Sequence, residues 1–146
     1  MANDLQIIDK LGKRLGRFEY KVSNNKVIVL FIRNEVIKPE DLQLIGKLTN
    51  LEELHFHSNQ ISKIEGLEGL TNLEMLYLYD NQITKIEGLE KLTNLEMLYL
   101  HDNKITKIEG LDNLVKLRVI WFSNNPIPKS QIDQFKKQNP KIVIYA

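Results

Sequence analysis

The stretch Leu51–Asn72, LEELHFHSNQISKIEGLEGLTN, decides the fold, because it recurs along the chain with small changes at a period of 22 residues. The next copies cover residues 73–94 and 95–116, and a further copy begins at Leu117. A period of this length indicates one supersecondary unit that is stacked on itself. We therefore expect function on a surface that several repeats build together, rather than in one local motif.

Length and composition indicate a single domain of ordinary globular type. The chain has 146 residues, of which 42% are hydrophobic and 27% are charged. Its net charge of +1 provides no broad field that would attract nucleic acid or anionic lipid. The chain has no cysteine, which excludes disulfide scaffolds, thiolate zinc sites and catalysis by a thiol.

The N-terminal residues carry no recognisable targeting signal. Residues 1–5, MANDL, lack the apolar core of a secretion signal. No apolar run approaches the length that a membrane-spanning helix needs. We therefore expect a cytoplasmic protein without a membrane partner, and a processed secreted form stays open as the alternative.

Aligning the units gives columns of identical or similar residues with the pattern L-x-x-L-x-L-x-x-N-x-I. The first apolar columns open each unit, and an asparagine follows them at position nine. An isoleucine follows two residues after each asparagine. The asparagine column consists of Asn59, Asn81, Asn103 and Asn125, and the isoleucine column of Ile61, Ile83, Ile105 and Ile127.

This pattern resembles the leucine-rich repeat family over roughly Val27 to Ile127. The resemblance implies an α/β fold, a right-handed solenoid with a parallel concave β-sheet and 3₁₀-like turns on its convex side. The repeat length and the phrase IEGLExLTNLE look like the class typified by the nuclear regulatory subunit of protein phosphatase 1. Bacterial internalins use a similar repeat length with aromatic concave faces. Both comparisons imply protein binding without catalysis, and neither identifies a partner.

The physical chemistry of the columns agrees with this resemblance. The alternation in Leu54-His55-Phe56-His57 predicts a half-buried strand, and stacked copies of it predict a parallel sheet. An asparagine amide both donates and accepts, so the column at position nine can satisfy backbone groups inside the turns. Gly66, Gly88 and Gly110 recur in the returning segments, where we expect them to supply a tight bend.

The first unit departs from the pattern. Residues 27–32, VIVLFI, fit the strand, but Glu35 stands where the other units have asparagine. Two extra residues lie near Lys38-Pro39-Glu40. A terminal repeat is often irregular because it must meet a cap.

We expect one domain over residues 1–146, with an N-terminal cap at 1–26, about five repeats at 27–125 and a C-terminal cap at 126–146. Asp4 is the expected N-cap of a helix that carries Leu5, Ile8, Leu11 and Leu15 on one face. A strand over residues 18–22 and a turn at 23–25 then form a hairpin. An alternative interpretation of the amphipathic helix is membrane binding, but closing the core explains it without a membrane.

The C-terminal cap is expected to contain a helix and a strand. Ser130 is the expected cap of a short helix that buries Ile132 and Phe135 and ends before Pro140. Residues 142–145, IVIY, are then expected to add a last strand.

The strand positions that face away from the core predict the composition of the concave surface. Positions three, five, seven and eight of the units bring together aromatic rings, all three histidines, two methionines and two aspartates. Val29 and Val119 are also placed on this face, at position three. The predicted binding residues are Phe31, Arg33, His55, His57, Met75, Tyr77, Tyr79, Asp80, Met97, Tyr99, His101, Asp102 and Trp121.

This composition favours recognition of a protein or peptide. Large aromatic residues that are exposed together are unusual in a monomer, and Tyr, Trp and Arg often anchor interfaces. Methionine adds adaptable apolar surface, and Asp80 and Asp102 would form a polar rim. An alternative is that the aromatic rings serve only to pack across neighbouring strands. A second alternative is a structural module that forms a homodimer through the same face.

The size of the face limits the partner. Five strands at about 4.8 Å, each about 17 Å long, give an area on the order of 400 Å². A standard interface buries roughly 800 Å² per partner. Flanking loops must therefore contribute, or the ligand is a peptide or helix, or binding is weak and transient.

Other kinds of chemistry find little support in the sequence. His55 and His57 lie two residues apart on one strand, whereas His57 and His101 are separated by two strand spacings, about 10 Å. We expect no metal site, no cofactor and no enzymatic activity, because no nucleophile, base and orienting acid cluster together. Arg33 and Lys104 are the basic residues near the aromatic face, so we expect no nucleic-acid binding.

Overall fold

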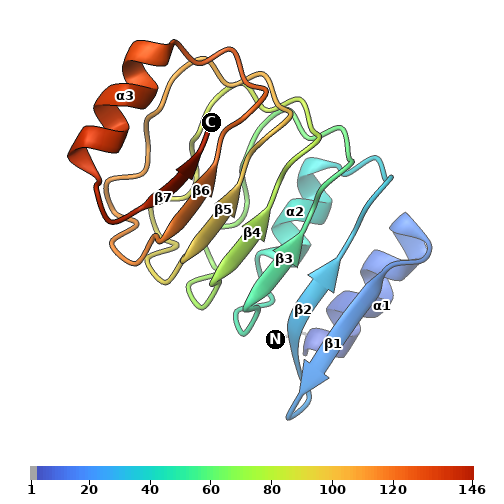
Figure 1. The fold of residues 1–146 in the computed structure, drawn as a ribbon. Helices are drawn as coiled ribbons and strands as arrows, with labels where there is room; N and C mark the ends of the chain where they lie inside the picture. The colour runs from blue at the N-terminus through green and yellow to red at the C-terminus, as the bar shows by residue number, and fades with distance from the viewer. Residues whose placement is uncertain (1–2) are drawn as a thin grey trace.

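The computed structural model describes residues 3–146, which form one arched sheet of seven strands with three helices (Figure 1). The strands follow in chain order across the sheet, and only the first pair is antiparallel. The elements are α1 (Asp4–Leu15), β1 (Glu19–Ser23), β2 (Lys26–Phe31), α2 (Pro39–Ile45), β3 (Glu53–His55), β4 (Met75–Tyr77), β5 (Met97–Tyr99), β6 (Val119–Trp121), α3 (Lys129–Gln138) and β7 (Val143–Tyr145). This arrangement confirms the predicted α/β solenoid with a helix and hairpin at one end and a helix and strand at the other.

The register of the sheet follows the repeat. Leu54 pairs with Leu76, and Leu76 pairs with Leu98, so each strand is matched to the same position of the next unit. These three side chains are 0% exposed and point into one continuous core. The helices α1 and α2 lie behind the sheet in Figure 1, on the side of the linking segments. The opposite, concave face is left without a covering helix in the part of the chain that the structure describes.

The segments that return behind the sheet are short turns. In the second repeat, the amide of Leu70 donates to the carbonyl of Leu67 at 3.0 Å, and the amide of Leu73 donates to Leu70 at 3.0 Å. Such i→i+3 bonds are of the 3₁₀ type, as the sequence predicts for the convex side. Gly88 has φ +72°, and a Cβ added to it would lie 2.7 Å from the carbonyl oxygen of Ile64. The glycine column therefore supplies the predicted bend and also allows the close approach of neighbouring repeats.

The first repeat contains an α-helix that the sequence analysis did not predict. In α2, Pro39 occupies the first turn, where its fixed φ favours helix, and Asp41 accepts from the backbone amide of Lys38 at 3.0 Å. The guanidinium of Arg14 in α1 contacts the 1%-exposed Asp41 carboxylate at 2.6 Å. The two extra residues of this repeat thus lie at the start of a seven-residue helix that is joined to the N-terminal cap.

Two details of the predicted N-terminal helix are wrong. The N-cap is Asn3, which forms a capping box with Gln6, and Asp4 is the first helical residue. Asp4 is instead buried, and its carboxylate accepts from the amide of Val27 at 2.8 Å, which joins the helix to β2. Leu5 was predicted to lie on the buried face of the helix but is 48% exposed, and Ile7 is buried in its place.

The hairpin that follows is confirmed. β1 pairs antiparallel with β2, and the turn residues Asn24 and Asn25 have φ values of 47° and 60°. Asparagine tolerates this left-handed conformation better than most residues, and two such residues in succession match the twist of a hairpin.

The C-terminal cap has the predicted elements but a different helix start. The helix α3 begins at Lys129 after Pro128, so Ser130 lies in the first turn and is not the cap. Ile132 and Phe135 pack against the core but are only partly buried, and the Phe135 ring lies 6.0 Å from that of Phe122. The strand β7 then pairs in parallel with β6 and extends the sheet.

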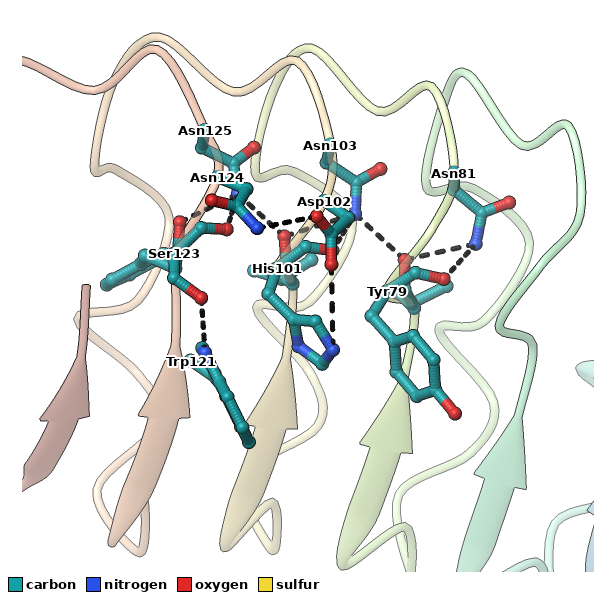
Figure 2. Close-up of polar contacts among 12 residues, drawn as sticks. Tyr79, Asn81, His101, Asp102, Asn103, Trp121, Ser123, Asn124 and Asn125 are labelled. Carbon is teal, nitrogen blue, oxygen red and sulfur yellow. Dashed lines mark hydrogen bonds and ion pairs between the residues drawn. The ribbon is translucent and has the colours of Figure 1, made fainter.

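A column of buried asparagines joins each repeat to the one before it. The side-chain amide of Asn81 donates to the carbonyl of Leu78 in its own repeat at 3.0 Å and to the carbonyl of Phe56 in the preceding repeat at 2.9 Å. Its side-chain oxygen accepts from the amide of Ile61 at 3.0 Å. Equivalent bonds are made by Asn59, Asn103 and Asn125. The asparagines therefore satisfy turn backbone groups, as the sequence predicts, and also act between repeats (Figure 2).

We expect Asn81→Leu to lower the free energy of unfolding by about 2 kcal/mol, because it leaves the buried amide of Ile61 without a partner. The carbonyls of Phe56 and Leu78 each lose one of two asparagine donors and keep the other, from Asn59 and Asn103 respectively. Urea denaturation followed by circular dichroism measures this change. Gln82→Ala is the matched control, since Gln82 is exposed in the same turn, and we expect it to change stability by less than about 0.5 kcal/mol. Equal effects of the two substitutions would contradict the role given to the asparagine column.

Candidate binding surface

Position five of the repeats forms a column of rings across the concave face. The imidazole of His55 lies between the rings of Phe31 and Tyr77, with centroid distances of 4.1 Å to each. Tyr77 stacks on Tyr99 at 4.6 Å with an interplanar angle of 8°. This first ring column consists of Phe31, His55, Tyr77, Tyr99, Trp121 and Tyr145.

A second ring column lies beside the first, at position seven. Tyr79 stacks between His57 at 4.6 Å and His101 at 4.4 Å. The ring of His101 lies 4.5 Å from that of Trp121, which joins the two columns at the C-terminal end. Figure 2 shows Tyr79, His101 and Trp121 on three consecutive repeats. The second ring column is defined as His57, Tyr79 and His101.

The ends of the second column carry polar residues. Arg33 is exposed, and its guanidinium contacts the carboxylate of Glu19 at 3.3 Å. At the other end, the indole nitrogen of Trp121 donates to the hydroxyl of Ser123 (Figure 2). Arg33 is therefore already partnered within the chain.

Position three contributes the remaining apolar surface. Met75 and Met97 are half-buried. The hydroxyl of Tyr77 lies 3.6 Å from the sulfur of Met75, and the hydroxyl of Tyr99 lies 3.7 Å from the sulfur of Met97. Val29 was predicted on this surface but is only 4% exposed. The reason is that β1 extends the sheet and places Lys21 beside Val29 in the register.

Stacking determines how much of each ring is available. All the predicted aromatic residues lie on one face, but they are half-buried rather than fully exposed. The parallel rings cover one another's faces, so that cross-strand packing stabilises the sheet, as the alternative interpretation proposed. What the columns present to solvent is ring edges, together with the phenol groups. Their role in binding stays a prediction.

The two aspartates of the predicted rim have a second, structural explanation. Asp80 and Asp102 both have φ 56°, and Asn34, Ser58 and Asn124 at the same position of other repeats are left-handed too. Small polar residues tolerate this conformation, so the turn itself favours them. Both aspartates are exposed at the edge where the chain leaves the strands. The carboxylate of Asp102 accepts from the side-chain amide of Asn124 at 2.8 Å (Figure 2).

Two parts of the surface were not predicted from the sequence. Tyr145 in β7 pairs with Trp121 in register, and its ring lies 5.1 Å from the indole. It was missed because the predicted face was counted over five strands. A column of glutamates at position two was also overlooked, although the alignment contains it. This column consists of Glu52, Glu74 and Glu96, and the first two line a shallow groove with Asn50, Asn72, Asn94 and Lys26.

The histidines are held in surroundings that favour the neutral ring. Burial lowers the pKa of His55, His57 and His101 below the ordinary value. For His55, a contact of 3.3 Å with the Glu53 carboxylate opposes this effect without reversing it. The Nδ1 atoms of His57 and His101 are buried and have no hydrogen-bond partner among residues 3–146. The face therefore carries no histidine charge at neutral pH.

The described residues include no group of three or more His, Asp or Glu side chains that could hold a metal ion. None of the helices within 3–146 is long and apolar enough to cross a membrane. The absence of a metal, a cofactor and catalysis stays a prediction.

We expect the chain to lose stability as the pH falls below about 6.5, the ordinary histidine pKa. The unfolded chain then takes up protons that the folded chain binds only at lower pH, because the three histidine pKa values are lowered. Chemical denaturation at several pH values between about 7.5 and 5 measures this. In His57→Phe, which keeps a ring in the column, the free energy of unfolding should depend less steeply on pH over this range. An unchanged pH dependence would contradict the role given to the histidines.

Comparison with known proteins identifies the repeats. The family model for leucine-rich repeats (two copies) matches residues 49–91, 71–113 and 93–137, which together cover more than half of the chain. No curated protein sequence matches the chain at a significant level. The phosphatase-subunit resemblance is not tested by these matches and stays a prediction.

Solved structures of bacterial and plant proteins share the fold. A leucine-rich repeat protein of Leptospira interrogans has a TM-score of 0.69 at 26% identity, over 76% of this chain and 28% of its own. An internalin of Listeria monocytogenes has a TM-score of 0.67 at 23% sequence identity, and the match covers 80% of this chain and 33% of the internalin. The ectodomain of a receptor kinase from Arabidopsis thaliana has a TM-score of 0.67 at 24% sequence identity, and the match covers 97% of this chain and 90% of the ectodomain.

The chain thus spans about a third or less of the two bacterial proteins. The identities with the internalin and the plant ectodomain show a common fold alone. The repeat pattern, the asparagine column and the family model agree with one another. The chain belongs to the leucine-rich repeat family.

Proposed function

We propose that the chain is a non-catalytic protein–protein interaction module whose concave face binds a peptide or a short segment of a protein. Leucine-rich repeat domains generally mediate protein–protein interaction. The observation that supports the concave face as the binding surface is its uncovered double column of rings. The helices α1 and α2 lie on the other side of the sheet, and α3 lies at its C-terminal end (Figure 1).

The size of the face favours a peptide over a globular partner. Six parallel strands, β2 to β7, at about 4.8 Å give a width of roughly 24 Å between the outer strands. The strands β3 to β6 have only three residues each, but positions three to eight of a repeat together extend about 17 Å along the strand direction. The area of the face therefore stays on the order of 400 Å², half of what one partner buries in a standard interface. A peptide that lies in the concave face can bury most of its own surface there.

Rigidity of the site supports binding as well. The rings stand on strands, and neighbouring rings hold one another at 4.1–4.6 Å over most of both columns. A surface that is ordered before the ligand arrives loses little conformational entropy on binding. A cytoplasmic location and the absence of nucleic-acid and membrane partners are part of this proposal.

We expect Tyr79→Ala to weaken the binding of concave-face peptides by about 2 kcal/mol, close to 30-fold in Kd. The ligands are peptides that are selected from a random library on the unchanged protein, and their Kd is measured by calorimetry. A single substitution is preferred, since removing Tyr77, Tyr99 and Trp121 together would also remove three stacked neighbours from the sheet.

Lys85→Ala is the control, because Lys85 is exposed on a segment that returns behind the sheet. We expect it to change the Kd less than about twofold. Selected peptides that lose affinity through Lys85→Ala but not through Tyr79→Ala would place the site on the convex side. Light scattering of the free protein addresses the alternative of self-association, which predicts a dimer that Tyr79→Ala disrupts.

A further inference from the structure

The concave face has a charge very different from that of the whole chain. In the second, third and fourth repeats, positions two, three, five, seven and eight contain no lysine and no arginine. The same positions contain six carboxylates, whereas the chain as a whole has a net charge of +1. These six residues, which we call the acidic borders, are Glu52, Glu53, Glu74, Glu96, Asp80 and Asp102.

The acidic borders lie on both sides of the rings. Glu52 and Glu74 line the groove at the edge where the strands begin, and Asp80 and Asp102 are exposed at the edge where they end. Six residues of extended chain separate position two from position eight, which is about 20 Å. The two ring columns occupy the space between these edges. A ligand that lies on the rings therefore has carboxylates along both of its flanks.

Most of this negative charge is not neutralised within the chain. Glu96 contacts Arg118 at 3.5 Å, and Glu53 contacts only the imidazole of His55, at 3.3 Å. Glu52, Glu74 and Asp80 make no ion pair with any residue of the described chain. Lys26 lines the same groove as Glu52 and Glu74 but makes no ion pair with either, and Lys21 lies beside Val29 at the N-terminal end of the sheet. Other lysines lie on the returning segments, as in the pairs of Lys63 with Glu65 and Lys107 with Glu109. Carboxylates that face solvent in one region create a field that attracts a cation and repels an anion.

The rings between the borders add acceptors rather than charge. Stacking covers the faces of Tyr77, Tyr79 and Tyr99, so a cation has little access to the ring faces themselves. The phenol oxygens remain as hydrogen-bond acceptors, and the methionines provide apolar surface. The composition thus suits a segment that combines basic and apolar side chains.

We infer that the concave face recognises a basic segment of another protein, in which Arg or Lys residues alternate with apolar ones. The inference rests on the proposed function and adds the chemistry of the partner to it. Apolar side chains of the segment contact the rings and methionines, and its basic side chains reach the carboxylates at both edges. Electrostatic complementarity of this kind selects partners and speeds their association. Nucleic acid is repelled by the same field.

The probes are two synthetic peptides of equal length, one with repeated Arg-Leu-Ser and one with repeated Glu-Leu-Ser. Their binding to the unchanged protein is measured by fluorescence anisotropy at about 20 and about 150 mM salt. We expect the basic peptide alone to bind, with an affinity that falls as salt rises. Equal binding of both peptides, or binding of the acidic one alone, overturns the inference.

A matched pair of variants locates the binding. The border variant carries Glu52→Gln, Glu74→Gln, Asp80→Asn and Asp102→Asn, where asparagine tolerates the left-handed turn as well as aspartate does. The control variant removes the same charge from the returning segments by Glu68→Gln, Glu87→Gln, Glu90→Gln and Asp112→Asn. We expect the Kd of the basic peptide to rise at least about tenfold in the border variant and less than about twofold in the control.

Equal effects of the two variants, with circular dichroism showing both folded, overturn the inference. So does a dimer of the free protein that dissociates in the border variant, because the basic occupant would then be a second copy. The library selection separates this inference from the proposed function. Selected peptides that depend on Tyr79 but are not enriched in Arg and Lys refute the basic partner and leave the binding surface standing. Peptides that do not depend on Tyr79 refute the binding surface itself.

Discussion

The hydrogen bonds of the asparagine column are the interaction on which the rest of the structure depends. Apolar contacts between stacked leucines have no direction and would tolerate small slips between repeats. Each asparagine amide instead ties a carbonyl of its own repeat and one of the preceding repeat to a single side chain. Because these bonds are buried and specific in distance, they fix the height of each strand relative to its neighbour.

Fixed strand heights account for the concave face. When equivalent residues lie side by side, rings at one position must stack, as Tyr77 does on Tyr99 at 4.6 Å. The same register collects carboxylates at the two edges of the sheet, away from the lysines of the returning segments. The rings thus serve the fold and the surface together. Recognition is left to ring edges, phenol groups, thioethers and the surrounding charge.

The sequence predicts most of this architecture because the repeat itself carries the information. The strand alternation, the asparagine bonds, the bend at Gly88 and the shared face of the rings all follow from position in the unit. The features that were missed depend on contacts outside the repeat. Asp4 bonds to Val27, and Arg14 contacts Asp41, so the first helix and α2 are defined by tertiary partners that periodicity does not reveal.

The most direct measurement is an NMR titration of the chain with a peptide selected from the random library. Selective methyl labelling of methionine and valine observes Met75 and Met97 on the face and Val115, which is 81% exposed behind the sheet. We expect the NMR signals of the Met75 and Met97 methyls and of the Trp121 indole proton to shift together, with one Kd, while the signals of Val115 stay unchanged. Shifts at Val115 with constant signals from the two methionines would contradict it.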